Sequence, residues 1–231
     1  MKGLINIFDQ FARRNNASTV LSSLLDICLT QFANPDCEIS KQEYAQAVLI
    51  LNDKKLINEF FREFLNETKK GINSSVGFSD VFGHLYMEVR GKYKGSALGQ
   101  FFTPTTICQL MAKITPIGKE NALVSDPTSG SGRLLLASYV ESMPTSLSAY
   151  YVAEDLDIIC VKMTALNMII HGLQGEVLHH DSLLSPNSWW RRYSIVRLPI
   201  GLLYYEIDLN GSREAYVQEK IELNSEQLKL F

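Results

Sequence analysis

Beyond residue 99, four short apolar runs alternate with helical stretches, and this alternation constrains the fold more than any other feature. The runs occupy residues 122–124, 149–153, 176–179 and 194–196, and helical patterns cover 134–140 and 158–171. Strands and helices in alternation predict a parallel sheet with right-handed crossovers. We therefore expect an α/β domain over residues 99–231, in which residues 202–209 leave room for a fifth strand.

The first 98 residues follow a different period. Their apolar residues recur at spacings of three and four, which is typical of one face of a helix. Ser40 followed by Glu43 forms a capping-box pattern for one helix, and Asp53 is placed to cap the next. These patterns predict a helical N-terminal domain over residues 1–98.

Composition excludes several classes of protein. The 231 residues are 46% hydrophobic and 20% charged, which is typical of a globular protein and not of a disordered chain. The net charge of −3 argues against a strongly basic nucleic-acid binder that acts alone. The cysteines lack the CxxC spacing of a zinc or redox site, so we expect reduced thiols and no metal. The N-terminal segment is neither a signal peptide nor a membrane span, so we expect a cytoplasmic protein with no membrane partner.

The segment VSDPTSGSGRLLL, at residues 124–136, carries the strongest indication of a ligand. A strand ends at Asp126 and Pro127, and Gly130 and Gly132 then make a tight turn into a helix. Glycines at this position let the backbone approach a ligand at the edge of an open α/β sheet. No Gly-Lys-Ser/Thr follows, and the third glycine of the dinucleotide fingerprint is missing, so neither phosphate-binding pattern is complete.

Acidic residues end three successive strands, at Asp126, Glu154 and Asp181. Asp126 suits a ligand with a positive amino group, Glu154 is placed to accept hydrogen bonds from two ribose hydroxyls, and Asp181 can accept one from an adenine amino group. Together they predict a site for S-adenosylmethionine. The alternative is that all three are solvated carboxylates at strand ends.

Five strings occur in the order of consecutive methyltransferase motifs: GQFFTP at 99–104, DPTSGSGRLLLAS at 126–138, YVAEDLD at 151–157, ALNMIIHG at 165–172 and GEVLHHDSLL at 175–184. Over residues 75–201 the chain resembles N6-adenine DNA methyltransferases, most closely the modification subunit of type I restriction–modification systems. The resemblance implies a truncated Rossmann-like, S-adenosylmethionine-dependent methyltransferase sheet at 99–231, preceded by an α-helical N-terminal domain.

The resemblance also implies roles for single residues. The segment Phe102-Thr103-Pro104 would contact the methionine end of the cofactor, and Thr103 can also cap the helix that Pro104 starts. Arg133 stands where a small or apolar residue is common, and nothing in the sequence accounts for it. The other implied cofactor-binding residues are Asp126, Pro127, Gly130 and Gly132 of the loop, with Glu154 at the ribose and Asp181 at the adenine.

The catalytic motif of the family, Asn/Asp-Pro-Pro-Tyr/Phe at the end of the fourth strand, does not occur in this sequence. Arginine and leucine side chains offer no acceptor for the amino group of a target adenine. The catalytic residues are therefore unknown, and Asn187 with Trp189 or Trp190 is an alternative source of an acceptor and a stacking ring. The stretch that corresponds to the motif reads Arg197, Leu198, Pro199 and Ile200.

Two functions follow from these patterns. The first is an S-adenosylmethionine-binding, N6-adenine DNA methyltransferase-like subunit that reaches DNA through a separate specificity subunit. The alternative is a catalytically inactive, shortened homologue that acts as a binding or regulatory module. Its partner would be a full-length modification subunit or a second copy of the chain. A methyltransferase for a small molecule or protein is a third candidate, against which the FFTP and ALNMIIHG strings argue.

Overall fold

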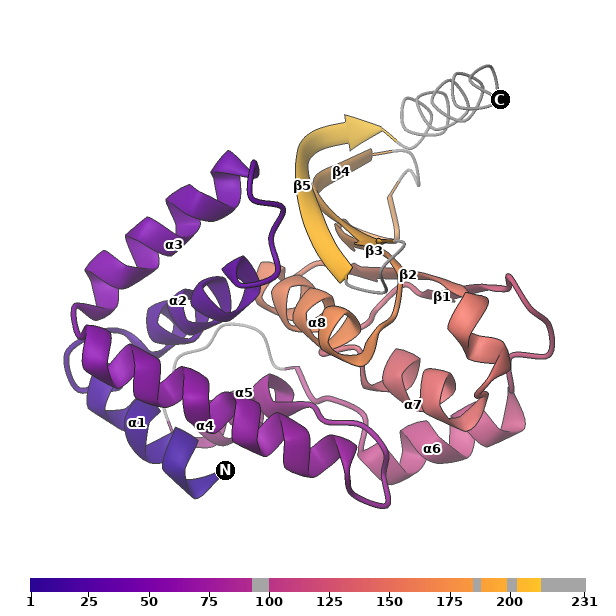
Figure 1. The fold of residues 1–231 in the computed structure, drawn as a ribbon, viewed down its shortest axis with the longest axis horizontal. Coiled ribbons are helices and arrows are strands. Elements are labelled where there is room, and N and C mark those ends of the chain that lie inside the picture. The colour runs from indigo at the N-terminus through magenta and orange to yellow at the C-terminus, as the bar shows by residue number, and fades with distance from the viewer. Residues whose placement is uncertain (93–99, 185–187, 199–202, 213–231) are drawn as a thin grey trace.

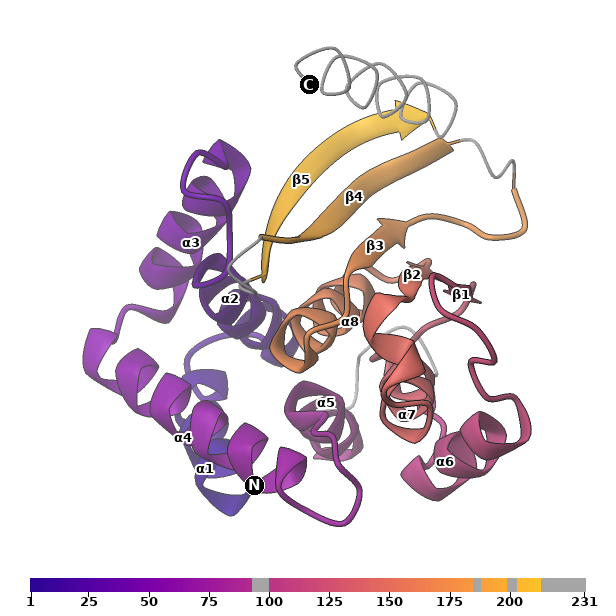
Figure 2. The ribbon, with the colours of Figure 1, turned by 45° about the vertical axis from the view of Figure 1, so that its right-hand side comes forward.

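The computed structural model describes residues 1–92, 100–184, 188–198 and 203–212, and its helices gather on one side of a five-stranded sheet (Figures 1 and 2). The helices are α1 (Lys2–Ala12), α2 (Ala17–Thr30), α3 (Glu38–Leu51), α4 (Lys54–Ile72), α5 (Val81–Lys92), α6 (Thr105–Ile114), α7 (Arg133–Glu141) and α8 (Ile158–His171), with a 3₁₀ turn at Thr145–Ser148. The strands are β1 (Leu123–Asp126), β2 (Tyr150–Asp155), β3 (Gly175–His179), β4 (Ser188–Arg197) and β5 (Leu203–Ser212).

The sheet is parallel only in its first part. Its order is β1-β2-β3-β4-β5, in which β1, β2 and β3 are parallel. β4 runs antiparallel to β3, and β5 runs antiparallel to β4, as the curved pair of strands in Figure 2 shows. The mixed α/β architecture that the sequence predicts is confirmed, including the fifth strand.

The expectation that the fourth strand continues the parallel sheet is wrong. A parallel connection needs a crossover of about a dozen residues or more, usually through a helix. Only residues 180–187 separate β3 from β4, and only residues 198–202 separate β4 from β5. Because both connections are too short for a crossover, each strand returns beside the one before it.

The N-terminal helices follow their predicted apolar faces. The cap at Asp53 is confirmed, because its carboxylate accepts a hydrogen bond of 3.0 Å from the Leu56 amide. The capping box at Ser40 is wrong, because α3 begins at Glu38, three residues before the start that a cap at Ser40 would give. The Ser40 hydroxyl is instead buried and lies 2.9 Å from the hydroxyl of Tyr205 on β5.

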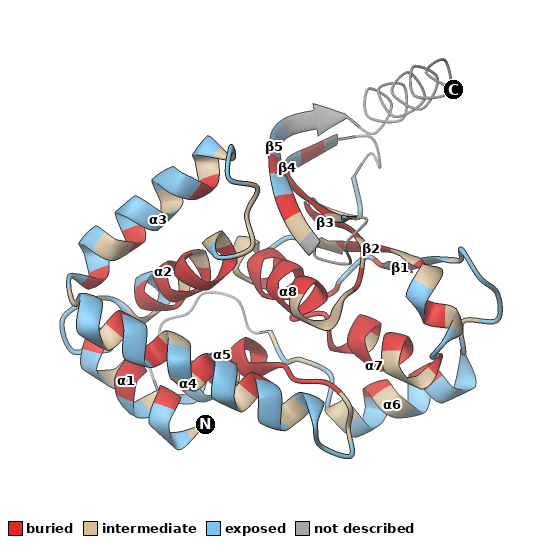
Figure 3. Cartoon of the chain, in the orientation of Figure 1, coloured by how far each residue is buried: buried red, intermediate tan, exposed pale blue. Residues whose placement is uncertain are grey.

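Helix α8 lies between the sheet and α2, and Figure 3 shows it buried along most of its length. It is apolar on almost every side, which is typical of a helix enclosed by protein. The one buried lysine on it, Lys162, pairs with Asp26 of α2 and Glu43 of α3. Charged contacts therefore join the N-terminal helices to the α/β part of the chain.

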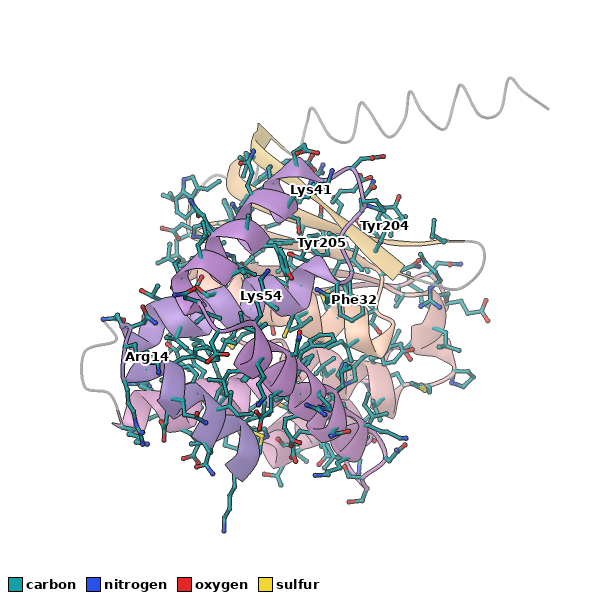
Figure 4. The ribbon with its side chains drawn as sticks, turned by 60° about the vertical axis from the view of Figure 1, so that its left-hand side comes forward. Arg14, Phe32, Lys41, Lys54, Tyr204 and Tyr205 are labelled. Atoms are coloured by element: carbon teal, nitrogen blue, oxygen red, sulfur yellow. The ribbon has the colours of Figure 1, made fainter. Side chains whose placement is uncertain are left out.

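Strand β5 also contacts the connection between α2 and α3. The backbone N–H of Tyr205 donates to the carbonyl of Phe32 at 3.1 Å. The backbone N–H of Asn34 donates to the carbonyl of Tyr205 at 2.9 Å. Figure 4 shows Tyr205 on the side of β5 that faces these helices. The predicted domain boundary near residue 98 stays a prediction.

The four cysteines are free thiols, and burial raises the pKa of Cys28 and Cys160. None of the helices in the described ranges has the length and apolar character that crossing a membrane requires.

Candidate functional site

A cavity of about 520 Å³ opens at the edge of the sheet where the parallel strands end. This volume falls within the usual range of about 300–1,000 Å³ for small-molecule sites. The lining comes from residues 100–103, 126–131, 155–156 and 180–183, together with Met111, Arg133 and Leu134. The cavity therefore brings together Phe102, Thr103, Asp126, Pro127, Gly130 and Asp181, all of which are expected from the sequence to bind cofactor.

The glycine loop is held against the end of β2. The Gly130 amide donates to the Asp155 carboxylate at 2.8 Å, and the Thr164 hydroxyl donates to the Gly130 carbonyl at 2.9 Å. Gly130 has φ +56°, and a Cβ there would lie 2.9 Å from the ring of Phe102. Gly132, at φ +80°, is the last residue before α7 and does not line the cavity. The loop is thus shaped by glycine, and Phe102 packs directly on it.

Two carboxylates in the cavity are buried without a cationic partner among the described residues. Asp126 and Asp155 are each 8% exposed, and burial raises the pKa of both above the ordinary value of 3.8. Backbone N–H groups offset part of the cost of burying these charges, since that of Thr128 donates to Asp126 and that of Asp157 donates to Asp155. Partly buried, uncompensated carboxylates favour a positively charged ligand, which would supply the missing counter-charge.

The acid of β2 that faces the cavity is Asp155, one residue beyond the predicted Glu154. Successive side chains of a strand point to opposite faces, so the two carboxylates cannot share one environment. Glu154 accepts a hydrogen bond of 2.8 Å from Nδ1 of His180, and it is His180 that lines the cavity. The role of Glu154 at the ribose stays a prediction, and Asp155 is a second candidate that sequence reasoning missed.

The segment before α6 forms one wall. The ring of Phe102 lies 5.0 Å from that of Tyr86 on α5. The expected cap by Thr103 is wrong, because α6 begins at Thr105 with Pro104 as the preceding residue and no side chain caps it. Thr103 instead lines the cavity, whereas Pro104 does not.

The structure accounts for Arg133, the first residue of α7. Its Nε pairs with the carboxylate of Asp80, which is 1% exposed. Asp80 also accepts hydrogen bonds from the Ser131 hydroxyl at 2.6 Å, the Asn167 amide at 2.8 Å and the Gly83 backbone N–H at 2.9 Å. This set of residues (Asp80, Gly83, Ser131, Arg133 and Asn167), here called the Asp80 network, connects α5 to the glycine loop and α8.

The stretch expected to correspond to the catalytic motif lies at the other edge of the sheet. Because β4 is antiparallel, its last residue, Arg197, is beside the start of β3, where its guanidinium donates to the Gly172 carbonyl. Leu198 follows it, and neither residue lines the cavity. Pro199 and Ile200 lie outside the described residues.

The described residues of the alternative, Trp189 and Trp190, do not line the cavity either. Asn187 lies outside the described residues. Trp189 is buried with its ring 5.0 Å from the Arg192 guanidinium, and Trp190 lies edge-on to His179.

A glycine loop between a parallel strand and a helix, with acids from successive strand ends around one cavity, is the arrangement in which open α/β folds hold nucleotide cofactors. Residues 78–196 match the family model of the N-6 DNA methylases, and the chain belongs to this family.

Curated relatives include type I restriction enzyme methylase subunits. The chain is 26% identical over 177 residues to the MjaIX methylase subunit of Methanocaldococcus jannaschii and 28% identical over 167 residues to the MpnII methylase subunit of Mycoplasma pneumoniae. These matches cover 72% and 68% of this chain but only 30% of each relative, so the chain spans about a third of their length.

Among solved structures, the chain is similar to the methyltransferase subunit of a type I restriction-modification system from Streptococcus thermophilus. The identity is 22% and the TM-score 0.39, over 64% of this chain and 34% of that one.

Proposed function

We propose that this chain is the S-adenosylmethionine-binding part of an N6-adenine DNA methyltransferase, in the manner of a type I modification subunit. The observation that carries the proposal is the convergence of Asp126, Asp155 and Asp181 on one cavity beside the Gly130 loop. Membership of the N-6 DNA methylase family supports it.

The residues of the cavity fit this cofactor in shape and in charge. A Cβ at Gly130 would lie 2.9 Å from the ring of Phe102, so glycine lets the loop and Phe102 pack together at the wall of the cavity. Asp126 and Asp155 are buried acids without a counter-charge among the described residues, which suits a cationic ligand. When bound, S-adenosylmethionine supplies a methyl group on a positively charged sulfur. Asp181 and Asp155 would hold the nucleoside, and Asp126 would face the ammonium.

A pair of variants tests this proposal and decides which acid of β2 holds the ribose. We expect Asp155→Asn to weaken S-adenosylmethionine binding by about tenfold or more, since hydrogen bonds to charged groups contribute roughly 1.5–3 kcal/mol. Glu154→Gln is the matched control, because the Glu154 side chain contacts His180 and is not among the described residues that line the cavity. We expect it to change the affinity by less than about threefold.

Isothermal titration calorimetry measures both variants against the unaltered chain. The opposite order of effects would place the ribose at Glu154, as the sequence predicts. No binding of S-adenosylmethionine to the unaltered chain would overturn the proposed function.

Methyl transfer to DNA is proposed as an activity of an assembly with a DNA-reading specificity subunit, in the cytoplasm. The second candidate function, a silent relative that binds the cofactor without transferring its methyl group, is favoured by one observation. Arg197 and Leu198, the described part of the stretch expected to correspond to the catalytic motif, lie at the end of the sheet away from the cavity. Assay of N6-methyladenine in DNA, with the chain and a specificity subunit together, separates the two. Methylation that Asp155→Asn abolishes supports the enzyme, and cofactor binding without methylation supports the silent relative.

A further inference from the structure

Arg133 has one nitrogen that nothing in the described chain satisfies. Its Nε pairs with Asp80, and its Nη1 lies 3.5 Å from the Thr103 carbonyl. Its Nη2 is buried and has no hydrogen-bond partner among the described residues. A buried guanidinium N–H without an acceptor is costly, and native structures rarely leave one unless a ligand, ion or water completes it.

The same side chain lines the cavity of the proposed cofactor. Arg133 is 9% exposed, and it is the only arginine or lysine among the described residues that line this cavity. The acids of the lining, Asp126, Asp155 and Asp181, come from the ends of three strands. The cavity therefore has acidic groups contributed by the sheet and one cationic group contributed by α7.

The start of α7 adds to this positive character. Gly132 precedes the helix in the left-handed conformation, and no side chain caps the first turn. A helix N-terminus carries a partial positive charge and favours an anion near its free amides. Arg133 is the first residue of that turn, so its guanidinium and the helix N-terminus both favour an anion at this place.

We infer that Arg133 recognises the carboxylate of the amino-acid part of the ligand through its guanidinium, whose hydrogen-bonding capacity the protein leaves incomplete. This inference rests on the proposed function and adds to it a specificity determinant. The ligand would be a nucleoside that bears a zwitterionic amino acid, with its ammonium held by Asp126 and its carboxylate by Arg133. The ion pair with Asp80 holds the Arg133 guanidinium in one orientation, so this side chain is already positioned before the ligand binds.

A purely structural role for Arg133 makes a different prediction. If the arginine only neutralises Asp80, a lysine at this position would serve as well. A lysine has one ammonium group in place of the arginine fork, so it cannot occupy the position of Nε beside Asp80 and that of Nη2 at once. Arg133→Lys therefore separates the two roles and keeps a cation beside the buried carboxylate.

Three ligands test the inference on the unaltered chain by isothermal titration calorimetry. They are S-adenosylmethionine, decarboxylated S-adenosylmethionine, and 5′-methylthioadenosine, which lacks the amino acid altogether. We expect S-adenosylmethionine to bind at least about tenfold more tightly than its decarboxylated form, as for one charge-assisted hydrogen bond. Decarboxylation also raises the positive charge of the ligand. The acids of the cavity would therefore favour the decarboxylated form, so tighter binding of S-adenosylmethionine cannot be explained by these acids.

The variants then assign the preference to Arg133. In Arg133→Lys the tenfold preference should fall to about threefold or less, with the affinity for 5′-methylthioadenosine unchanged. A double variant, Asp80→Asn with Arg133→Gln, removes both buried charges together, and it should lose the same preference. Thermal unfolding of each variant checks that it is folded.

The outcomes separate the inference from the proposed function. If 5′-methylthioadenosine binds and the carboxylate gives no preference, the inference is overturned and the nucleoside site stands. A preference that survives unchanged in Arg133→Lys overturns it as well. If none of the three ligands binds, the proposed function fails, and the inference fails with it.

Discussion

Replacing Asp80 by alanine should lower the free energy of unfolding by about 3–5 kcal/mol, the range for removing one partner of a buried ion pair. The loss is large because Arg133 would keep a buried charge without its counter-ion. Ser131, Asn167 and Gly83 would also lose an acceptor. Urea unfolding followed by circular dichroism measures the change.

Asp53 provides the matched control, since its carboxylate also accepts a hydrogen bond from the first turn of a helix. No ion pair with a buried arginine accompanies that bond, so Asp53→Ala should cost only about 1 kcal/mol, the usual value of an N-cap. Equal losses in the two variants would mean that Asp80 contributes no more than a cap and that its pairing with Arg133 adds nothing to stability.

The second large effect is expected at Gly175, the first residue of β3. Its φ is +152°, and a Cβ there would lie 1.9 Å from the carbonyl oxygen of Tyr151. This contact is with the backbone of β2, at the position where the two strands pair, so no side chain can move aside to relieve it. Strain in this conformation and overpacking each cost roughly 1–3 kcal/mol, so Gly175→Ala should destabilise the chain by about 3 kcal/mol or more.

Gly118→Ala is the control for Gly175, because a Cβ at Gly118 meets nothing within 4 Å. We expect a change within about 0.5 kcal/mol, as for other surface substitutions. Thermal unfolding of the two alanine variants under identical conditions makes the comparison. A loss at Gly175 as small as that at Gly118 would show that the strands can separate without cost at this point.

The regular elements could be predicted where local chemistry agrees with tertiary packing. Helix α8 has the predicted bounds because Asp157 caps its start and Gly172 ends it in the left-handed conformation. Ser40 shows the opposite case, since its capping pattern is overridden by a contact with Tyr205, 165 residues away. The direction of β4 could not be predicted in the same way, because the expected strand at 194–196 leaves a connection long enough for a crossover, whereas β4 already begins at Ser188.

The site could be predicted only in part, for reasons of strand geometry. Asp126 and Asp181 were predictable because each lies within three residues of the last apolar residue of a predicted strand. Glu154 and Asp155 are adjacent acids at the end of one strand, and only the extent of β2 and the face of each side chain distinguish them. The pairing of Arg133 with Asp80 spans 53 residues and has no local pattern from which it could be inferred.

The pairing of Asp80 with Arg133 makes the glycine loop and the N-terminal helices depend on each other. Asp80 belongs to the part of the sequence with a helical period, and Arg133 to the part with alternating strands. A cut between the two at residue 98 would leave an uncompensated guanidinium inside the α/β fragment. The whole of residues 1–212 should therefore melt in a single cooperative transition, and a ligand that tightens the loop should protect the amides of α5 from hydrogen exchange as well as those of α7.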